Sequence, residues 1–274
     1  MSSKKERVTY HSGQWVPETE ASIHIYDSQF MFGDGVFEMV RTFNHKYFLL
    51  EDHIDRLFRS MKYLQIPITK TKQEVIDLCH EVFDRNKEYW NSKPGGHLEE
   101  VRLMINVSRG PLAIYREVFD LKEGQAWNEP TWIINAWPLS KTAAALGHYY
   151  TMGVNAVIPP QRQIPSRLLE NKVKNRSRMH YQMANLQTKN SGKDAMALLL
   201  DEDGFLTEGT GANFIMVKDG KLITPELRNM LRGSSMMYII NVLAPQLGLE
   251  VVHKNIEPYD LMEADEAMFT GTYV

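Results

Sequence analysis

The spacing of apolar residues changes twice along the first half of the chain, and this constrains the fold more than any other feature. Between residues 21 and 50, short apolar runs alternate with turn residues such as Gly33-Asp34-Gly35, which predicts strands and a hairpin. From Glu51 the apolar residues recur at helical spacing, which predicts helices within 54–64 and 75–83. Strand-like runs then follow at 101–107 and 131–137. The first part of the chain, residues 1–139, is therefore expected to be a small α+β domain.

The second half of the chain is rich in short strand patterns and turns. Residues 140–147 are small and weakly patterned, and are expected to form an interdomain linker. Beyond them, residues 148–274 predict short strands at 151–158, 195–200, 214–217, 221–223, 250–254 and 267–270, with helices at 175–190 and 234–247. Many short strands with turn residues between them favour a curved, barrel-like sheet with flanking helices. The expected fold class is therefore α+β with two domains.

Composition narrows the classes of function. The chain has 274 residues and a formal net charge of −3, so no basic excess indicates binding to nucleic acid or to an anionic membrane. The N-terminus is polar, and the most apolar stretch, 236–252, is interrupted by Pro245 and Glu250, so neither a signal peptide nor a membrane span is expected. The single cysteine, Cys79, excludes an intramolecular disulfide and is expected to be a buried, inert thiol. We therefore expect a cytoplasmic protein that acts on small molecules.

Four short motifs could carry chemistry, although each is ordinary by itself. Lys174 lies among five basic residues between Lys172 and His180, where a lysine is usually a solvated surface residue. Glu208 lies in a turn with glycines at 209 and 211, which could simply join two strands.

The other two motifs contain hydroxyl groups. Ser234 and Ser235 begin an apolar helical pattern, where they could serve as the N-cap or, with the backbone N–H groups, bind a phosphate. The segment Phe269–Thr272 is a strand pattern that ends in small and hydroxyl-bearing residues.

Taken in order, these motifs resemble the class IV aminotransferases, which depend on pyridoxal 5'-phosphate (PLP). This family includes branched-chain aminotransferases, D-amino acid aminotransferases and aminodeoxychorismate lyases. The resemblance covers nearly the whole chain. It consists of Phe32–Glu38, Glu51–Leu57, Val173-Lys174, Glu208–Asn213, Leu231–Gly233 and Phe269–Thr272.

The resemblance implies a catalytic role for Lys174, which would carry PLP as a Schiff base and then act as the general base. Lys172 is the rival for this role. Lys174 is preferred because Val173 precedes it and because its 34-residue spacing to Glu208 resembles that in the family. Glu208 would lie beside the pyridine nitrogen and favour its protonated form.

The resemblance also implies a phosphate site made of Arg56, Ser234, Ser235 and Thr272. Family members often have an arginine directly after the residues that correspond to Ser234 and Ser235. This chain lacks it, and Arg232 is the candidate to replace it. Family members also run on for a few tens of residues beyond Thr272, so we expect the C-terminus either to have been shortened or to lack this tail.

Substrate recognition is the part on which the resemblance is least specific. The candidate substrate-binding residues are Phe37, Met39, Arg41, Arg116 and Arg178, with Phe30 as a further wall residue. Arg178 favours a lyase, because lyases of the family have an arginine four residues after the lysine. Three readings therefore stay open: a transaminase acting on an amino acid (branched-chain-like or D-amino acid) and a 2-oxo acid, an aminodeoxychorismate-type lyase, and a non-catalytic PLP-binding homologue. The family also implies a homodimer.

Overall fold

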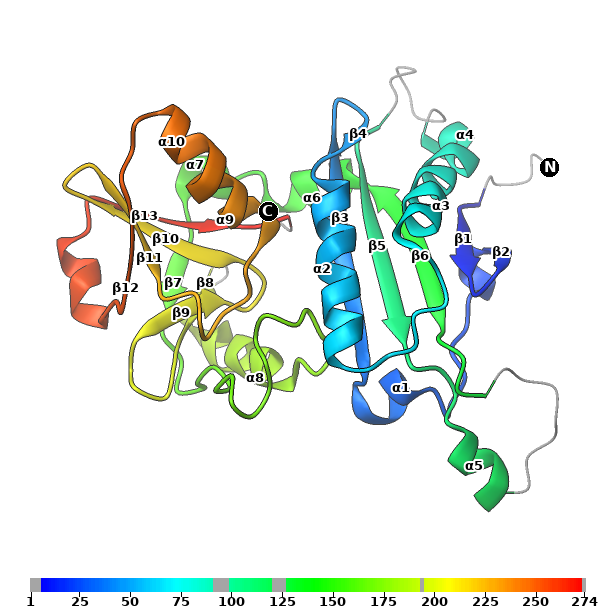
Figure 1. The fold of residues 1–274 in the computed structure, drawn as a ribbon. Helices are drawn as coiled ribbons and strands as arrows, with labels where there is room; N and C mark the ends of the chain where they lie inside the picture. The colour runs from blue at the N-terminus through cyan, green and yellow to red at the C-terminus, as the bar shows by residue number, and fades with distance from the viewer. Residues whose placement is uncertain (1–5, 91–98, 120–126, 193–194, 273–274) are drawn as a thin grey trace. The chain divides into compact units, whose positions relative to one another are not determined.

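The computed structural model describes residues 6–90, 99–119, 127–192 and 195–272. It contains two compact units (Figure 1). The first unit contains Met1–Ala144 together with Lys174–Ser177, and the second contains Ala145–Val173 together with Arg178–Val274. The chain around Lys174 therefore leaves the second unit for four residues and joins the first.

An antiparallel sheet of six strands forms the centre of the first unit, in the order β2-β1-β6-β5-β3-β4. Its strands are β1 (Val8–His11), β2 (Gln14–Pro17), β3 (Gly35–Phe43), β4 (Lys46–Tyr47), β5 (Val101–Ser108) and β6 (Trp132–Pro138). The pairing of β3 with β5 aligns Phe37 with Asn106, Met39 with Met104 and Arg41 with Arg102.

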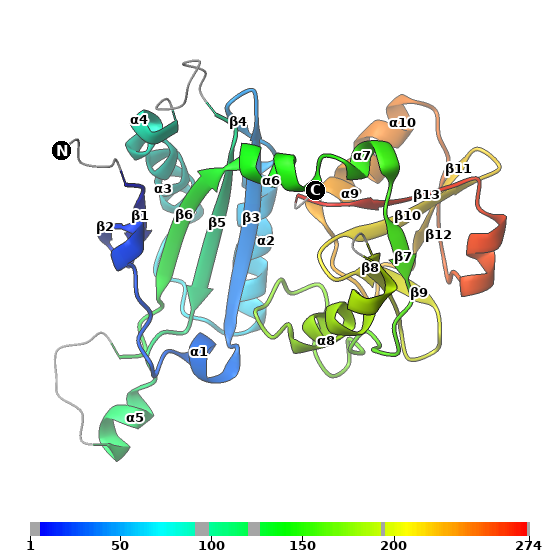
Figure 2. The same ribbon diagram turned by 180° about the vertical axis from the view of Figure 1, so that it is seen from behind.

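Two helices, α2 (Leu50–Tyr63) and α3 (Lys72–Arg85), cover one face of this sheet (Figures 1 and 2). Successive side chains of a strand point to opposite faces. In β3 the residues that point toward the helices are fully buried; they are Val36, Glu38, Val40 and Thr42. The residues between them point to the other face; they include Phe37, Met39 and Arg41. The shorter helical elements of this unit are a 3-10 turn (Glu18–Glu20), α1 (Ser28–Phe32), α4 (Lys87–Trp90) and α5 (Ala113–Val118).

The second unit contains a sheet of seven strands. The main path is β12-β11-β10-β9-β8-β7, and β13 pairs with β10. Its strands are β7 (Asn155–Val157), β8 (Ala195–Leu200), β9 (Leu206–Gly209), β10 (Asn213–Lys218), β11 (Lys221–Pro225), β12 (Val251–Lys254) and β13 (Glu266–Thr270). The helical elements are α7 (Tyr149–Met152), α8 (Met179–Thr188), a 3-10 turn (Lys189–Ser191), α9 (Ser234–Tyr238), a π-helical turn (Ile239–Leu243), α10 (Ala244–Gln246) and a 3-10 helix (Pro258–Glu263).

Strand β10 separates two layers of the apolar core of the second unit. Phe214 and Met216 pack on one side with β8, β9 and Ile256. Ile215 packs on the other side with Met236 and Ile240 of the helical segment that begins at Ser234. The apolar alternation along this strand therefore fixes which face the α9 segment covers.

The α+β class with two parts is confirmed, but several elements differ in detail from the expectation. The boundary between the two units, at Ala144 and Ala145, lies within the expected linker 140–147, and this segment is mostly helical, because α6 spans Leu139–Leu146; its alanines are strong helix formers. The strand expected over 151–158 is a short helix, α7, followed by a strand of three residues. No strand forms at 21–25. The barrel-like curvature is not confirmed: among the described residues the strand path runs from β12 to β7, with no pairing that closes it.

The expectation about the single cysteine agrees with the structure. Cys79 is fully buried, and burial raises the pKa of its thiol far above the ordinary value, so it is unreactive. Within the described residues, no helix has both the length and the apolar character needed to cross a bilayer.

Candidate active site

Lys174 lies in a short extended segment that pairs with the start of β3. The Phe37 N–H donates to the Lys174 carbonyl oxygen over 3.0 Å, and the Arg176 N–H donates to the Gly35 carbonyl oxygen over 2.9 Å. Between these bonds, Asn175 forms an antiparallel bridge with Val36. Lys174 is thus held by the backbone of a central strand of the first unit rather than by a mobile surface loop.

The side chains of the two candidate lysines have different surroundings. The Lys174 Nζ lies 4.8 Å from the centroid of the Phe37 ring, a distance suited to a cation–π contact. The Lys172 Nζ forms an ion pair with Glu170 over 2.8 Å. An amine held by a carboxylate is a poorer nucleophile, so this ion pair disfavours Lys172 as the residue that carries a cofactor.

Arg56, the expected phosphate ligand, belongs to a buried cluster on the helix-covered face of the same sheet. Its Nε and Nη2 donate to the two carboxylate oxygens of Glu38 over 2.6 and 2.7 Å. His53 Nδ1 lies 2.7 Å from Glu38 Oε2. Arg56 and His53 are three residues apart on α2, so both reach the same strand residue.

Burial and charge oppose each other at this cluster. Burial disfavours the ionised form of Glu38, but the Arg56 guanidinium and then His53 outweigh it and hold the pKa of Glu38 well below its usual range. Burial lowers the pKa of His53 despite the nearby Glu38 carboxylate, and the positive charges of Arg56 and Lys174 lower it further. Glu38 is therefore an anion, and it fixes the orientation of the Arg56 guanidinium.

Glu208 is the centre of a buried polar cluster in the second unit. Its Oε1 accepts hydrogen bonds from Gln163 Nε2 at 2.9 Å, Tyr181 OH at 2.9 Å and the Leu231 N–H at 3.1 Å. Its Oε2 accepts from Asn213 Nδ2 at 3.1 Å. Neutral donors of this kind stabilise a buried carboxylate in its charged form.

Tyr181 is the least expected member of this cluster. Burial, together with the Glu208 carboxylate, raises its pKa well above the ordinary value of 10.0. Its hydroxyl therefore stays protonated and remains a donor to Glu208 over the whole physiological range of pH.

Asn213 brings the remaining motifs of the second unit together. It lies opposite Glu208 in the pairing of β10 with β9, and opposite Thr270 in the pairing of β10 with β13. Its Nδ2 also donates to the Leu231 carbonyl oxygen over 2.7 Å. Gly233 is required here because a Cβ atom would lie 2.0 Å from Asn213 Oδ1. The motifs at 206–214, 231–235 and 269–272 therefore meet at one side chain.

The serines and the last threonine lie at the edges of this arrangement. The N-cap of α9 is Gly233, and Ser234 and Ser235 are the first two helical residues, so of the two alternatives for these serines the N-cap role does not apply. Thr272 follows β13 and is half-buried. The adjacent Gly271 packs against Gly211 and Ala212 of the Glu208 turn.

Comparison with known proteins identifies the family. The model of the family described as "Amino-transferase class IV" matches residues 35–274. A putative branched-chain-amino-acid aminotransferase of Methanocaldococcus jannaschii is 34% identical over 96% of this chain and 83% of its own length. The chain belongs to the class IV aminotransferases.

Other relatives agree with this assignment. An aminodeoxychorismate lyase of Bacillus subtilis is 28% identical over 96% of this chain and 82% of its own. The crystal structure of a branched-chain aminotransferase from Thermoproteus uzoniensis with norvaline has a TM-score of 0.82 at 25% identity, covering 98% of this chain and 84% of that one. The expected family, the enzyme class and PLP as cofactor are thereby confirmed: the protein is a PLP-dependent aminotransferase.

Within this aminotransferase, the expected site residues fall into two groups. Lys174 and Phe37 lie close together in the first unit, where Arg56 binds Glu38 on the helix-covered face of the sheet. Glu208 and the residues around Asn213 lie close together in the second unit. Met39 and Arg41 lie further along the same face of β3, where the Arg41 guanidinium stacks on Phe43 with Cζ 4.2 Å from the ring centroid. Arg116 lies on α5.

Arg178 makes contacts inside the second unit. It donates to the Thr210 carbonyl oxygen and lies over the Tyr181 ring, with Cζ 4.5 Å from the ring centroid. The guanidinium is therefore directed toward the turn that contains Glu208.

Sequence reasoning missed several residues that the structure brings to these clusters; they are Glu38, His53, Gln163, Arg176 and Tyr181. Glu38 and His53 lay within quoted motifs but were given no role of their own. Gln163 had no local signal, because it reaches Glu208 only through the tertiary fold.

Proposed function

We propose that this aminotransferase transfers an amino group between an amino acid and a 2-oxo acid, with Lys174 as the residue that carries PLP. The observation that carries the assignment is the backbone pairing of Lys174 with β3, which holds its Nζ over the Phe37 ring near the Arg56 cluster. Catalytic groups on a rigid strand are held more accurately than groups on loops.

The donor set of the chain fits PLP. The cofactor has an aldehyde, a ring nitrogen and a phosphate, and the chain supplies a lysine amine, a buried carboxylate, and an arginine with a hydroxyl-bearing helix start. When bound, PLP acts as an electron sink that stabilises the carbanion formed at the substrate Cα. The intact set argues against a non-catalytic homologue.

The proposed roles follow from the charges. Lys174 Nζ takes the proton from the substrate Cα. The resemblance to the family supports Arg56, which Glu38 orients, and Ser234, Ser235 and Thr272 as the residues that would bind the phosphate. Glu208, whose carboxylate accepts four hydrogen bonds, would hold the ring nitrogen and favour its protonated form.

The lysine assignment is tested with two matched variants, Lys174→Ala and Lys172→Ala. The visible absorption band that PLP gives when linked to a lysine should be absent in Lys174→Ala and present in Lys172→Ala. The opposite pattern, or a band retained in both, would show that another amine carries the cofactor.

We further propose that the substrate is a branched-chain-like or D-amino acid, contacted by Phe37, Met39, Arg41, Arg116 and Arg178. The position of Phe37 beside Lys174 supports this, because it places an aromatic wall next to the reacting amine. A panel of L- and D-amino acids, scored by loss of the PLP band in single half-reactions, tests the proposal. A response to simple amines alone would refute it.

An aminodeoxychorismate-type lyase is the second candidate. It is supported by the position of Arg178 and by the B. subtilis relative, which is named as such a lyase. Release of pyruvate from aminodeoxychorismate without a 2-oxo acid acceptor would identify the lyase. Turnover that requires the acceptor would identify the transaminase.

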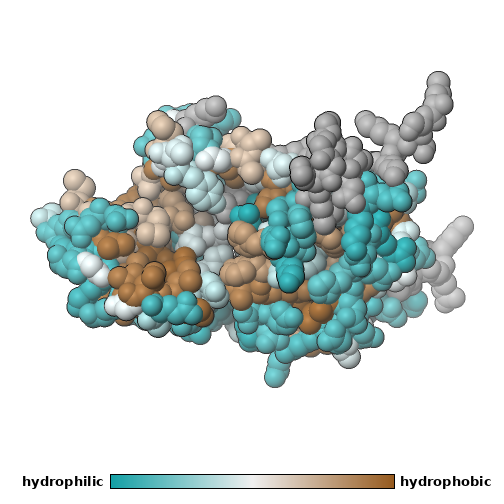
Figure 3. Space-filling model, turned by 90° about the horizontal axis from the view of Figure 1, so that it is seen from above, coloured by the Kyte–Doolittle hydropathy of each residue, from teal (hydrophilic) through white to brown (hydrophobic). Residues whose placement is uncertain are grey.

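We also propose a homodimer that acts in the cytoplasm. Exposed apolar side chains support a dimer: Phe30 and Phe32 of α1 are 70% and 62% exposed, and Ile114 and Val118 of α5 are also exposed. Other apolar patches among hydrophilic residues are visible from above in Figure 3. The single cysteine suits a reducing compartment. Light scattering that gives the mass of one chain at micromolar concentration would refute the dimer.

A further inference from the structure

Gln163 is buried inside the second unit although its side chain is a polar amide. It is 1% exposed and lies in the loop between β7 and α8. Its N–H donates to the carbonyl oxygen of Leu200, at the end of β8, over 2.9 Å, which fixes the backbone from which the side chain starts. The side chain reaches the Glu208 carboxylate, where Nε2 lies 2.9 Å from Oε1. The amide is therefore held beside this carboxylate by the fold of the second unit.

The Gln163 amide, the Tyr181 hydroxyl and one oxygen of Glu208 form a closed triangle of hydrogen bonds. Gln163 Nε2 donates to Tyr181 OH and to Glu208 Oε1, and Tyr181 OH donates to the same Oε1, each over 2.9 Å. Donation to the Tyr181 oxygen polarises the O–H group, which makes the hydroxyl a stronger donor to the carboxylate. Gln163 therefore acts on Glu208 both directly and through Tyr181.

The other end of the amide shows that Glu208 determines its orientation. Gln163 Oε1 is buried and has no hydrogen-bond partner among the described residues, and a buried acceptor without a donor costs free energy. Turning the amide over would place this oxygen where Nε2 now lies, 2.9 Å from Glu208 Oε1, and would set two acceptors against each other. The second carboxylate oxygen accepts from Asn213 Nδ2 at 3.1 Å. The donors around Glu208 are therefore matched to an ionised carboxylate.

Two titratable or charged side chains beside Tyr181 also influence this cluster. The Arg178 guanidinium lies over the Tyr181 ring, with Cζ 4.5 Å from the ring centroid, and supplies a fixed positive charge. The His180 ring packs on Tyr181 with the ring centroids 3.9 Å apart, and burial, followed by the charge of Arg178, lowers the pKa of His180 to about 4. His180 is therefore neutral at pH 7. Neither contact involves Gln163, so a substitution of Gln163 leaves both in place.

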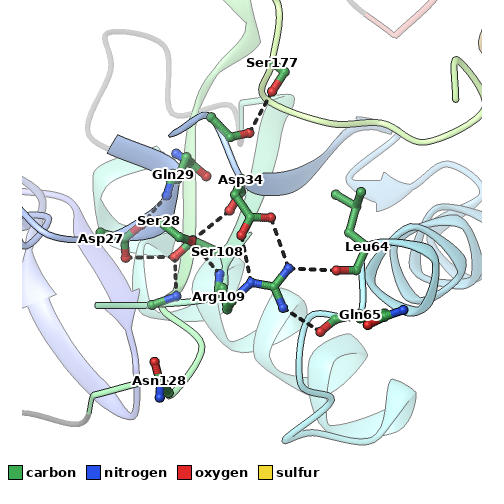
Figure 4. Close-up of polar contacts among 12 residues, drawn as sticks. Asp27, Ser28, Gln29, Asp34, Leu64, Gln65, Ser108, Arg109, Asn128 and Ser177 are labelled. Atoms are coloured by element: carbon green, nitrogen blue, oxygen red, sulfur yellow. Dashed lines mark hydrogen bonds and ion pairs between the residues drawn. The ribbon is translucent and has the colours of Figure 1, made fainter. Parts of the chain in front are cut away.

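The segment that carries Lys174 is anchored by a separate set of contacts in the first unit. Ser177 Oγ donates to the Gly33 carbonyl oxygen over 3.2 Å, which attaches the end of this segment to the loop after α1. Figure 4 shows that Arg109 fixes the same loop, because its guanidinium donates to the Asp34 carboxylate and to two backbone carbonyl oxygens. A substitution in the second unit therefore leaves these anchors of the lysine segment intact.

We propose that Gln163 is a positioning residue which, directly and through Tyr181, keeps Glu208 in the anionic form that pairs with a protonated ring nitrogen of PLP. The inference rests on the proposed function, which places Glu208 at that nitrogen. The carboxylate and the nitrogen share one proton, and burial alone would favour the neutral pair with the proton on Glu208. Donors to the carboxylate favour the ionic pair, because hydrogen bonds to a charged acceptor are stronger. Gln163 thus shifts the shared proton toward the ring nitrogen.

The relative affinity for two forms of the cofactor tests this role. The first form is PLP, and the second is the analogue in which a C–H group replaces the ring nitrogen. The analogue keeps the aldehyde and the phosphate, so it lacks only the atom that Glu208 would hold. Both are titrated into cofactor-free wild type, Gln163→Met and the control Gln161→Met, whose Nε2 donates to the Arg162 carbonyl oxygen instead. The quantity compared is the ratio of the two dissociation constants.

Wild type should bind PLP more tightly than the analogue, because the anionic Glu208 gains a positive partner only in PLP. Gln163→Met should reduce this preference about tenfold or more, as expected for the loss of a hydrogen bond to a charged group, and Gln161→Met should leave it unchanged. A merely structural role for Gln163 would weaken the binding of both forms equally. Tyr181→Phe should also reduce the preference, and the double variant should reduce it by less than the product of the two single effects.

The outcomes separate this inference from the proposed function. An unchanged ratio in Gln163→Met, or a wild type without a preference for PLP, would overturn the positioning role, although Lys174→Ala can still lose the PLP band. Effects of Gln163→Met and Tyr181→Phe that simply multiply would overturn the action through Tyr181. If Lys174→Ala keeps the PLP band, the proposed function fails instead. Should Gln163→Met not fold, Gln163→Leu also removes the amide, and the same ratio decides the matter.

Discussion

Replacing Glu38 by glutamine should destabilise the first unit strongly, because it leaves the Arg56 charge buried without its anion. Glu38 is 0% exposed and binds Arg56 through both carboxylate oxygens. Removing one member of a buried ion pair costs about 3–5 kcal/mol. The glutamine oxygen can still accept one hydrogen bond, so we expect the low end, about 3 kcal/mol, which corresponds to a Tm lower by about 6–12 °C.

The effect of Glu38→Gln should depend on pH. Folding lowers the pKa of Glu38, so its stabilisation is fully present above the ordinary value near 4.5 and is lost as the pH falls below it toward the folded value. The Tm difference between wild type and variant should therefore be largest above about pH 5.5 and become smaller at pH 4.

Thermal unfolding followed by circular dichroism measures this difference. Glu81→Gln is the matched control, since its carboxylate is 42% exposed and pairs with Arg85 on the surface; it should cost less than about 1 kcal/mol. A Glu38→Gln protein with the wild-type Tm, or a Tm difference that is the same at pH 4 and pH 7, would refute the argument that Glu38 is a buried, ionised partner of Arg56.

Two further substitutions test the cluster around Glu208. Tyr181→Phe removes a charged hydrogen bond worth about 1.5–3 kcal/mol, so PLP binding measured by titration should weaken about tenfold or more. The loss should be equal at pH 6 and pH 9, because the high pKa of Tyr181 keeps its hydroxyl protonated. The control Tyr150→Phe, at a residue that is 71% exposed, should bind PLP as wild type does, and an equal loss in both variants would contradict the role of Tyr181 as a donor to Glu208. Gly233→Ala should lower the free energy of unfolding by about 1–3 kcal/mol through overpacking against Asn213, as measured by denaturant titration. In the control Gly211→Ala the added Cβ meets no atom within 4 Å, so the free energy of unfolding should fall clearly less.

The parts of the fold that the sequence predicted are those set by local patterns. The apolar spacing of α2, α3, β5 and β6 indicates directly which residues face the core, so these elements were expected close to their observed bounds. The helix in segment 140–147 was not predicted, because small residues without a clear apolar period occur in irregular linkers and in short helices alike.

The site was predictable only as separate motifs. The ordered set of motifs pointed to Lys174 and Glu208, but the four residues Lys174–Ser177 join the first unit through long-range pairing with β3, which no local signal encodes. Gln163 and Tyr181 are likewise 45 and 27 residues from Glu208 in the chain, and only tertiary structure brings them to it. Non-local contacts of this kind determine the electrostatics of the site.

The central claim of the account is that Lys174, and not its neighbour Lys172, carries PLP. Reducing the holoenzyme with borohydride fixes the cofactor to its lysine, and mass spectrometry of the digested protein then locates the added group. The account predicts the phosphopyridoxyl adduct on Lys174. An adduct on Lys172 or on any other lysine would contradict it.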